Sequence, residues 1–252
     1  MKKGWYHTVG WFVVLALTQT HALSAQDARE IVRKADQQVR GESSIAQIEM
    51  TIKRPSWQRS ILMKAWTKGN DYSLIRILSP ARDAGTAFLK RKNEIWNWLP
   101  GIDRTIKLPP SMMMQSWMGS DFTNDDLVRE SSAVNDYYHT LLGDSIVNGL
   151  PCHKIQMIPK PDAPVVWSKL IVWITKADYL QLRVEFYDER GKKINLMTGS
   201  DIKMIGGRKL PARMEMVPLD KKGHATIMIY KSIEFNKPLR DDFFSISQLK
   251  KG

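Results

Sequence analysis

The sequence predicts a mainly β protein with a small amount of helix, built on one large antiparallel sheet. Three observations indicate this fold class. Beyond residue 41, apolar and polar residues alternate over most of the chain, which is typical of strands that are solvated on one face only. Turn signals such as DERGK, IGGRK and DKKGH separate the alternating runs, so most neighbouring strands are joined by hairpins. The helical period of 3.6 residues is found before residue 41 and then gives way to the period of two.

Residues 1–25 have the layout of a secretory signal peptide. Two lysines precede an uncharged apolar run from about Val9 to Leu17, and small residues follow around Ala22 to Ala25. The run is too short to span a bilayer, so this layout favours a cleaved signal over a membrane anchor. No cysteine follows the run to accept a lipid. We therefore expect residues 26–252 to form a single, soluble, exported domain.

The charge balance is strongly basic. Removing Lys2 and Lys3 with the signal lowers the basic count from 38 to 36 against 26 acidic residues, a net charge of +10. Such an excess favours anionic partners such as phospholipid headgroups, lipopolysaccharide or nucleic acid. Export makes nucleic acid the least suitable of these, and the chain has neither an aromatic RNA-binding signature nor a helix-turn-helix pattern. We expect no nucleic-acid partner.

Cys152 is the only cysteine, so no internal disulfide can form and stability must come from a core of sufficient size. Its setting, LPCHKIQM, reads as the start of a strand. This favours a buried or half-buried small apolar side chain over a nucleophile.

The first element after the signal is an amphipathic helix. One face of DAREIVRKADQQVR is apolar at helical spacing and the other is charged. Asp27 and Glu30 resemble a capping box, and Gly41 supplies the stop. The apolar face consists of Ala28, Ile31, Val32, Ala35 and Val39. The helix therefore requires an apolar surface to pack against.

Runs with a period of two residues predict the individual strands. IAQIEMTIKR (residues 45–54) and LQLRVEF (residues 180–186) alternate most regularly. Less regular runs occupy about 57–67, 71–78, 85–91, 94–99, 103–108, 152–158, 167–175, 192–197, 201–205, 209–217 and 224–235. A sheet of roughly eleven to thirteen strands must curl, and its apolar face must be covered. The two candidates for the cover are the N-terminal helix and a helical or irregular segment from about 110 to 145.

That covering segment begins with PPSMMMQSWMGSDFTNDDL, residues 109–127. A calcium loop starting at Asp121 would need glycine at its sixth position and glutamate at its twelfth, where the chain has Asp126 and Ser132. Thr123 followed by Asp126 instead fits a helix N-cap. The acids therefore indicate capping rather than a metal or acid–base site.

Other catalytic patterns are absent from the sequence. The signal removes two histidines, and the remaining three, His139, His153 and His224, are far apart, with no HExxH, GxSxG or CxxC motif. The glycines do not form a phosphate-binding loop. We expect no catalytic residues, no metal and no cofactor, and hence no enzyme.

The apolar residues of the covering segment and of the strand NEIWNWLP are the candidate binding residues. Core packing is the plain alternative for each one taken singly. Successive methionines, however, specify rigid packing poorly and adapt to ligands of variable shape. The candidates are Trp96, Trp98, Met112, Met113, Met114, Trp117, Met118 and Phe122.

The segments NEIWNWLP, RTIKLPPSMM, GSDFTNDDL and RDDFFSISQL resemble the outer membrane lipoprotein-sorting proteins, the LolA-like family, and the likeness extends from about Ile48 to Leu249. The resemblance implies an unclosed antiparallel β half-barrel of about eleven strands, covered by an N-terminal helix and a helical lid. Its interior would receive the acyl chains of a lipid or lipoprotein in the periplasm. The branch of this family that the sequence resembles is often encoded beside RND-type or MMPL-like exporters. The resemblance therefore implies that the cargo is a lipid that such a pump handles.

The resemblance implies a periplasmic carrier that moves its cargo between an inner-membrane exporter and the outer membrane, with transient contact to a membrane surface. A lipid sensor or adaptor that transfers nothing is the alternative, since it would use the same cavity. We expect the lid to fill the empty cavity with its own side chains and to swing out on loading. The basic residues Arg91, Lys92, Arg104 and Lys107 are rim candidates for anionic headgroups, or ordinary solvated charges.

Overall fold

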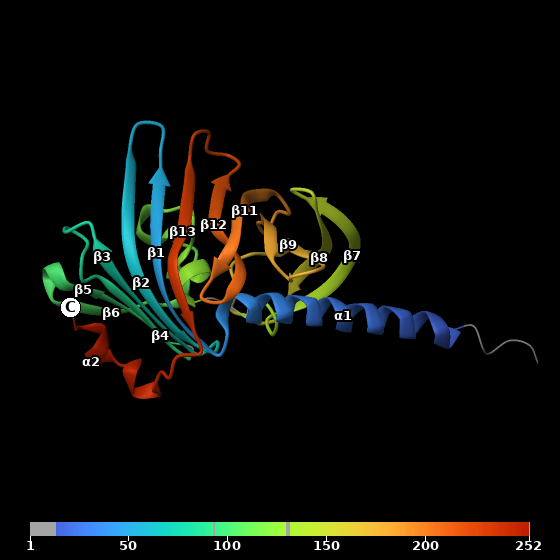
Figure 1. Ribbon diagram of the computed structural model, residues 1–252, viewed down its shortest axis with the longest axis horizontal. Coiled ribbons are helices and arrows are strands. Elements are labelled where there is room, and N and C mark those ends of the chain that lie inside the picture. The colour runs from blue at the N-terminus through green and yellow to red at the C-terminus, as the bar shows by residue number, and fades with distance from the viewer. Residues whose placement is uncertain (1–13, 93, 130–131, 252) are drawn as a thin grey trace, which may run out of the picture.

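The computed structural model describes residues 14–92, 94–129 and 132–251, and it is dominated by one antiparallel sheet (Figure 1). The expected fold class is confirmed, with a strand count at the upper end of the expected range. The strands are β1 (Ser43–Lys53), β2 (Gln58–Lys68), β3 (Tyr72–Ser79), β4 (Ala87–Arg91), β5 (Glu94–Leu99), β6 (Arg104–Lys107), β7 (Tyr137–Val147), β8 (Leu150–Pro159), β9 (Lys169–Thr175), β10 (Gln181–Tyr187), β11 (Lys193–Ile205), β12 (Arg208–Pro218) and β13 (Ala225–Phe235).

The strand order explains why a connecting segment must cross the concave face of the sheet, which we call the hollow. The order is β6-β5-β4-β3-β2-β1-β13-β12-β11-β10-β9-β8-β7. Strands β1 to β6 and β7 to β13 form two meanders, which the antiparallel pairing of β1 with β13 joins. β6 and β7 therefore lie at opposite ends of the sheet. Residues 108–136 connect these ends, and we call them the lid.

β1 shows how the alternation in the sequence becomes a core. Met50 and Ile52 are fully buried, whereas Lys53 at the end of the strand is exposed. Met50 lies opposite Ile61 of β2 and Met228 of β13, so apolar side chains adjoin across three strands. Burying each such side chain contributes roughly 1.5–3 kcal/mol. The junction between the two meanders is therefore apolar on its inner face.

β7 was not expected as a strand, because its residues up to about 145 were assigned to the covering segment. It is an edge strand with buried Tyr137 and His139 on one face. Its other face also carries an exposed apolar residue, Tyr138, and a β-bulge between Leu141 and Gly143 then shifts the alternation by one residue. A strand that is apolar on both faces gives no clean period of two, and the prediction was wrong here for that reason.

β11 is a single strand where two separate runs were expected, at 192–197 and 201–205. The intervening TGSD resembles a turn in sequence, but here it continues the pairing with β12. Gly199 lies where the strands approach closely, and a Cβ atom at this position would be 3.0 Å from the carbonyl oxygen of Gln181. The glycine therefore permits close approach and does not mark a strand end.

The N-terminal helix α1 (Val14–Arg40) begins earlier than expected. The capping box at Asp27 and Glu30 does not mark its start, because the helix continues back into the predicted signal peptide. Residues 14–26 contain no glycine or proline to stop it, and their alanines and leucines favour helix. The remainder of the predicted signal, residues 1–13, lies outside the described residues, and its cleavage stays a prediction.

The apolar face and the end of α1 agree with expectation. Ala28, Val32 and Ala35 are buried in the main core on the hollow side of the sheet. Gly41 adopts a φ of 65°, and its N–H donates to the carbonyl oxygen of Gln37 at 3.0 Å. In Figure 1, α1 runs beneath the β7–β13 half, and its N-terminal part extends past β7. Within the three described ranges, no helix is long and apolar enough to cross a membrane.

The C-terminal segment covers the opposite, outer face of the sheet. It contains the 3₁₀ turn η5 (Asp241–Phe243) and the short helix α2 (Ile246–Leu249), which Figure 1 shows beneath the β3–β5 region. Phe244 is fully buried with its ring 5.3 Å from that of Tyr72. A second apolar cluster thus separates the outer face of β3–β5 from water.

Candidate functional site

A cavity of about 350 Å³ lies between the hollow face of the sheet, α1 and the lid. Both meanders contribute to its wall, and so do Val32 and Val39 of α1 and Phe122 and Leu127 of the lid. This volume is at the low end of the range of roughly 300–1,000 Å³ typical of sites for small molecules. The site is therefore a mostly apolar chamber that the lid partly covers.

Methionines on the strands are prominent in the wall of this cavity. They come from β2, β8, β11, β12 and β13, and their thioether chains surround the empty volume. They are Met63, Met157, Met197, Met214 and Met228. None of them was among the candidate binding residues, because a methionine on the apolar face of a strand has the same pattern as an ordinary core residue. The adaptable, methionine-rich lining was expected on the lid, and the sheet supplies it.

The lid is a series of short turns rather than the helical lid that was expected. Two prolines start it and lead into the 3₁₀ turns η2 (Pro110–Met112) and η3 (Trp117–Gly119). Ser116 and Thr123 then form an isolated antiparallel bridge, which closes a compact loop. Such a loop has few backbone hydrogen bonds to the sheet, so side chains must hold it in place.

The capping role of the lid acids is confirmed. The Thr123 N–H donates to Asp126 Oδ2 at 2.8 Å, and the Asp126 N–H donates to Thr123 Oγ1 at 3.1 Å. These reciprocal bonds introduce a single π-helical turn, η4 (Asp125–Arg129). Among the described residues, no cluster of three or more His, Cys, Asp or Glu side chains is arranged to hold a metal ion.

The structure brings part of the predicted site together beneath the lid. Met113, Trp117 and Phe122 are 2%, 0% and 3% exposed and belong to the main core. The ring of Trp117 lies 5.3 Å from that of Phe88, so it fills the β4 end of the hollow. Of the predicted residues, only Phe122 lines the cavity itself. The others under the lid occupy the space next to it.

The remaining lid candidates are less deeply placed. Met112 and Met118 are partly buried and pack against the main core. Met118 has a φ of 50°, so the turn at η3 is strained at this residue. Met114 is 55% exposed and does not line the cavity.

Trp96 and Trp98 do not lie on the cavity, which corrects their expected position. Both are on the outer face of β5, in the cluster that the C-terminal segment covers. Trp98 is 7% exposed, and Lys250 lies over its ring at 5.2 Å. The inward residue of this strand is Ile95, which belongs to the main core. The period of two showed correctly that the tryptophans share a face, but it did not show which face.

The basic rim candidates lie near the β4–β6 end of the sheet and do not line the cavity. Lys107 forms an ion pair with Glu94 and lies over the Trp96 ring at 5.7 Å. Arg91 and Arg104 are exposed at strand ends. Their positions fit the second interpretation, that they are ordinary solvated charges on the strands.

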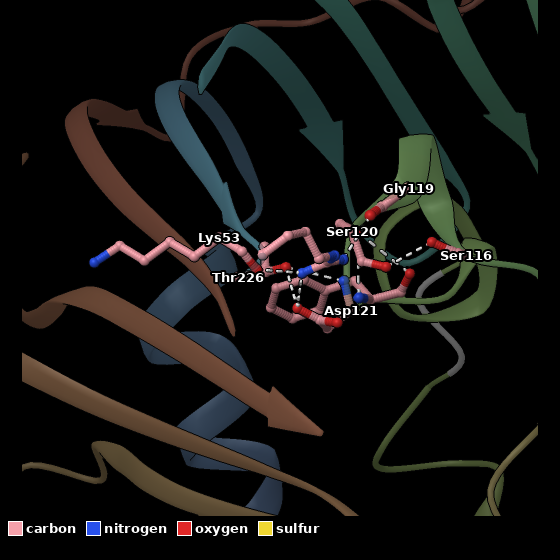
Figure 2. Close-up of polar contacts among 8 residues, drawn as sticks. Lys53, Ser116, Gly119, Ser120, Asp121 and Thr226 are labelled. Carbon is pink, nitrogen blue, oxygen red and sulfur yellow. Dashed lines mark hydrogen bonds and ion pairs between the residues drawn. The ribbon is translucent and has the colours of Figure 1, made fainter. Parts of the chain in front are cut away.

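Two charged groups anchor the lid to the sheet. Arg54 Nη1 donates to Asp121 Oδ2 at 3.0 Å, and its Nη2 donates to the Gly119 carbonyl oxygen at 2.7 Å. Thr226 Oγ1 donates to the same Asp121 oxygen at 2.7 Å and accepts the Asp121 N–H at 2.9 Å. Figure 2 shows Asp121 and Thr226 in contact beside Gly119. The Arg54 and Asp121 side chains are only 10% and 5% exposed, so water screens this pair weakly.

Replacing Arg54 by methionine is expected to lower the free energy of unfolding by about 3 kcal/mol, because the Asp121 carboxylate would stay buried without its cation. Urea unfolding of the variant measures this loss. The double variant R54M/D121N removes both charges and should recover at least a third of the loss. Equal stability of R54M and the wild type would show that the pair does not anchor the lid.

A second carboxyl group of the lid lies at the cavity wall. Asp126 accepts hydrogen bonds from the Thr123 N–H and, at 2.9 Å, from Trp167 Nε1. Desolvation by burial outweighs these bonds and raises the pKa of Asp126 above its ordinary value. Burial and the nearby carboxylates of Asp125 and Asp126 also raise the pKa of Tyr137, so its hydroxyl stays protonated at neutral pH. The cavity is therefore mostly apolar, with a carboxyl group at one part of its wall.

The raised pKa of Asp126 predicts a definite pH dependence. The folded protein binds the proton of this group more tightly than the unfolded chain does, so the group favours folding as pH falls from neutral toward the ordinary pKa of aspartate. Compared with D126N, the wild type should gain relative stability between pH 7 and pH 4. Unfolding of both proteins across this range measures the difference, and a constant difference would contradict the assignment.

The other candidates for chemistry are structural. Cys152 is fully buried among Trp173, Leu180 and neighbouring apolar residues, and burial raises the pKa of its thiol. His139 is buried, its Nε2 lies 2.7 Å from the Ala133 carbonyl oxygen, and desolvation lowers its pKa. Neither residue lines the cavity.

Comparisons with known proteins place this geometry in a family. A protein-family model described as "uncharacterized protein" matches residues 69–251. No curated protein is significantly similar in sequence. A domain from Vibrio parahaemolyticus, described as an outer membrane lipoprotein-sorting protein, is 26% identical with a TM-score of 0.80, and the match covers 90% of this chain and 100% of that one.

Two further solved structures show the same fold. A DUF1329 family protein from Desulfovibrio piger is 24% identical with a TM-score of 0.80, over 90% of this chain and 99% of that one. A LolA superfamily protein from Nitrosomonas europaea is 21% identical with a TM-score of 0.76, over 88% of this chain and 98% of that one. The unclosed antiparallel sheet with its covering segments is common to these proteins.

Proposed function

The chain belongs to the LolA-like family of outer membrane lipoprotein-sorting proteins, and on this basis we propose that it is a periplasmic carrier of acyl chains. The observation that carries the proposal is the methionine-lined cavity of about 350 Å³ beneath the lid. Its wall offers apolar, adaptable contacts without a set of convergent catalytic groups. The proposed cargo is the hydrocarbon part of a lipid or of a lipoprotein.

The free energy of transferring an acyl chain out of water supports a carrier with a covered cavity. Transferring an acyl chain of about fifteen methylenes out of water is favourable by roughly 12 kcal/mol, at about 0.8 kcal/mol for each methylene. A free chain would therefore stay in its membrane instead of crossing the periplasm. The carrier must supply an apolar environment that is better than water but less favourable than the bilayer, because it must also release the chain.

The lid supplies the reduction in affinity that release requires. Full loading displaces Met113, Trp117 and Phe122 from their buried positions. Exposing three such side chains costs roughly 5–9 kcal/mol. The remaining driving force of roughly 3–7 kcal/mol corresponds to dissociation constants from millimolar to about 10 µM. Such a carrier binds the chain in preference to water and releases it readily into a bilayer, and it loads when a donor delivers the chain out of its membrane.

A vesicle transfer experiment tests the proposal. Donor vesicles carrying a self-quenched fluorescent phospholipid are mixed with unlabelled acceptor vesicles and the purified protein without residues 1–25. A carrier increases the rate of dequenching in proportion to protein concentration. A sensor or adaptor binds the labelled lipid but leaves the transfer rate unchanged, which would replace the carrier by the alternative. Absence of any lipid binding would remove both functions.

The donor in this scheme is an inner-membrane exporter of RND or MMPL type, and the destination of the cargo is the outer membrane. The family resemblance supports this part of the proposal. Site-specific photocrosslinking from the exposed side chain of Met114, on the outer surface of the lid, would identify the donor in cells. Crosslinks to soluble proteins alone would contradict an exporter as donor.

A further inference from the structure

Two loops at one end of the sheet meet to form a single projection. They are residues 53–58, around the β1–β2 turn, and residues 219–224, between β12 and β13, and together we call them the tip. Gly223 has a φ of 78°, and a Cβ atom there would lie 3.3 Å from Pro55 Cγ, so the loops are in contact. Figure 1 shows both loops projecting beyond the neighbouring strands at the same end.

The tip exposes two large apolar side chains among cations. Trp57 is 50% exposed and Leu219 is 47% exposed. The tip has four basic residues, Lys53, Arg54, Lys221 and Lys222, and a single acid, Asp220. The three lysines are exposed. Tryptophan and leucine flanked by lysines are typical of protein segments that lie at an anionic membrane surface, where rings enter the headgroup region and ammonium groups meet phosphates.

The tip is also the place where the lid is anchored. Arg54, which binds Asp121 and Gly119 of the lid, lies over the Trp57 ring at 5.7 Å. Thr226, the other anchor of Asp121, follows the second loop of the tip by two residues. A surface that contacts the tip is therefore adjacent to the contacts that hold the lid over the cavity.

We propose that the tip docks the protein on a bilayer that contains anionic phospholipid. Trp57 and Leu219 enter the headgroup region, and Lys53, Lys221 and Lys222 face the lipid phosphates. Docking in this orientation presents the anchored side of the lid to the membrane, and in this respect the inference rests on the proposed function. A bilayer fits better than a protein partner, because two exposed apolar side chains among three exposed lysines are too small an apolar patch for a stable protein interface.

Vesicle flotation tests the docking with the cargo-free protein lacking residues 1–25. Vesicles of phosphatidylcholine with phosphatidylglycerol are compared with vesicles of phosphatidylcholine alone. We expect binding only to the anionic vesicles, and binding that weakens as salt concentration rises. The variant K221S/K222S should bind about thirtyfold more weakly, given the contribution of each basic side chain near an anionic surface. The variant W57A/L219A should lose at least tenfold.

Matched controls separate docking at the tip from general attraction. K203S/K237S removes two exposed lysines, and I146A/M204A removes two exposed apolar residues, in each case away from the tip. Both controls should bind vesicles within about twofold of the wild type. Wild-type protein that does not float with anionic vesicles would overturn the proposal. Tip variants that float like the wild type, or controls that lose binding equally, would overturn it as well.

A parallel measurement distinguishes this inference from the proposed function. Uptake of a fluorescent fatty acid is measured in solution, without vesicles, for the wild type and the tip variants. The tip variants should take up the fatty acid like the wild type, since none of their substituted residues lines the cavity. Failure of the wild type to take up the acyl chain would refute the carrier function whatever the vesicle result.

Discussion

Oxidation of the variant D121C/T226C is expected to abolish acyl-chain uptake, and reduction is expected to restore it. The two side chains are in direct contact, with Thr226 Oγ1 2.7 Å from Asp121 Oδ2, so a disulfide between these positions would tie the lid to β13. If Phe122 and its neighbours must leave the hollow for the chain to enter, the tie blocks loading. Fluorescent fatty-acid binding with and without reductant measures the effect, with an expected loss of more than tenfold on oxidation.

Controls for the disulfide experiment are available in the chain itself. The single variants D121C and T226C each lose the hydrogen bond between the two side chains but cannot form the disulfide, so oxidant should leave their uptake unchanged. Cys152 is fully buried on the other face of the sheet and does not compete for oxidation. Uptake by the oxidised double variant at the level of its reduced form would show that loading does not need the lid to move.

Filling the cavity by A65W is expected to weaken acyl-chain binding about two hundredfold. Ala65 is 9% exposed on the inner face of β2 and lines the cavity. An indole at this position would displace about four methylenes of the chain, each worth about 0.8 kcal/mol. Titration with a fluorescent fatty acid measures the affinity, and thermal unfolding confirms that the variant is folded.

The matched control for A65W is S60W, which places the same indole at an exposed position on β2. It should retain wild-type affinity. Weakening in S60W equal to that in A65W would show that tryptophan on this strand acts through the fold and not through the volume of the cavity. Unchanged affinity in A65W would locate the chain elsewhere.

The sheet was predictable from the sequence because most of its strands have one solvent-exposed face and one buried face. β1 shows this most clearly, with Met50 and Ile52 buried and Lys53 exposed. β7 was missed because Tyr138 makes its outer face apolar as well, and because a β-bulge between Leu141 and Gly143 shifts its alternation by one residue. An edge strand is defined by the absence of a second neighbour, and local periodicity does not report this property.

The lid was predictable in its capping and in its position, but not in its internal form. The Thr123–Asp126 pair is a local signal that depends on residues three apart, and it formed as expected. The anchor between Arg54 and Asp121 spans distant parts of the chain, so sequence alone carries no sign of it. Short 3₁₀ turns likewise leave no periodic pattern.

The binding residues were the least predictable part. The methionine run of the lid was conspicuous in sequence, whereas Met63, Met157 and the other cavity methionines are spread over five strands and only the curl of the sheet brings them together. Trp96 and Trp98 were assigned to the wrong side because the C-terminal segment that covers them is a tertiary feature. The methionines that are adjacent in sequence lie on the lid, whereas the methionines that lie together around the cavity come from separate strands of the sheet.

A crystal structure of the protein with a fatty acid carrying bromine at mid-chain tests the exchange of lid side chains for an acyl chain most directly. We expect an anomalous bromine peak among Met63, Met214 and Met228, with Met113 and Trp117 withdrawn from the hollow. A bromine peak on the outer face of the sheet would contradict the exchange of lid side chains for an acyl chain. An intact lid over a cavity with no bound chain, in crystals where bromine is found elsewhere, would contradict it equally.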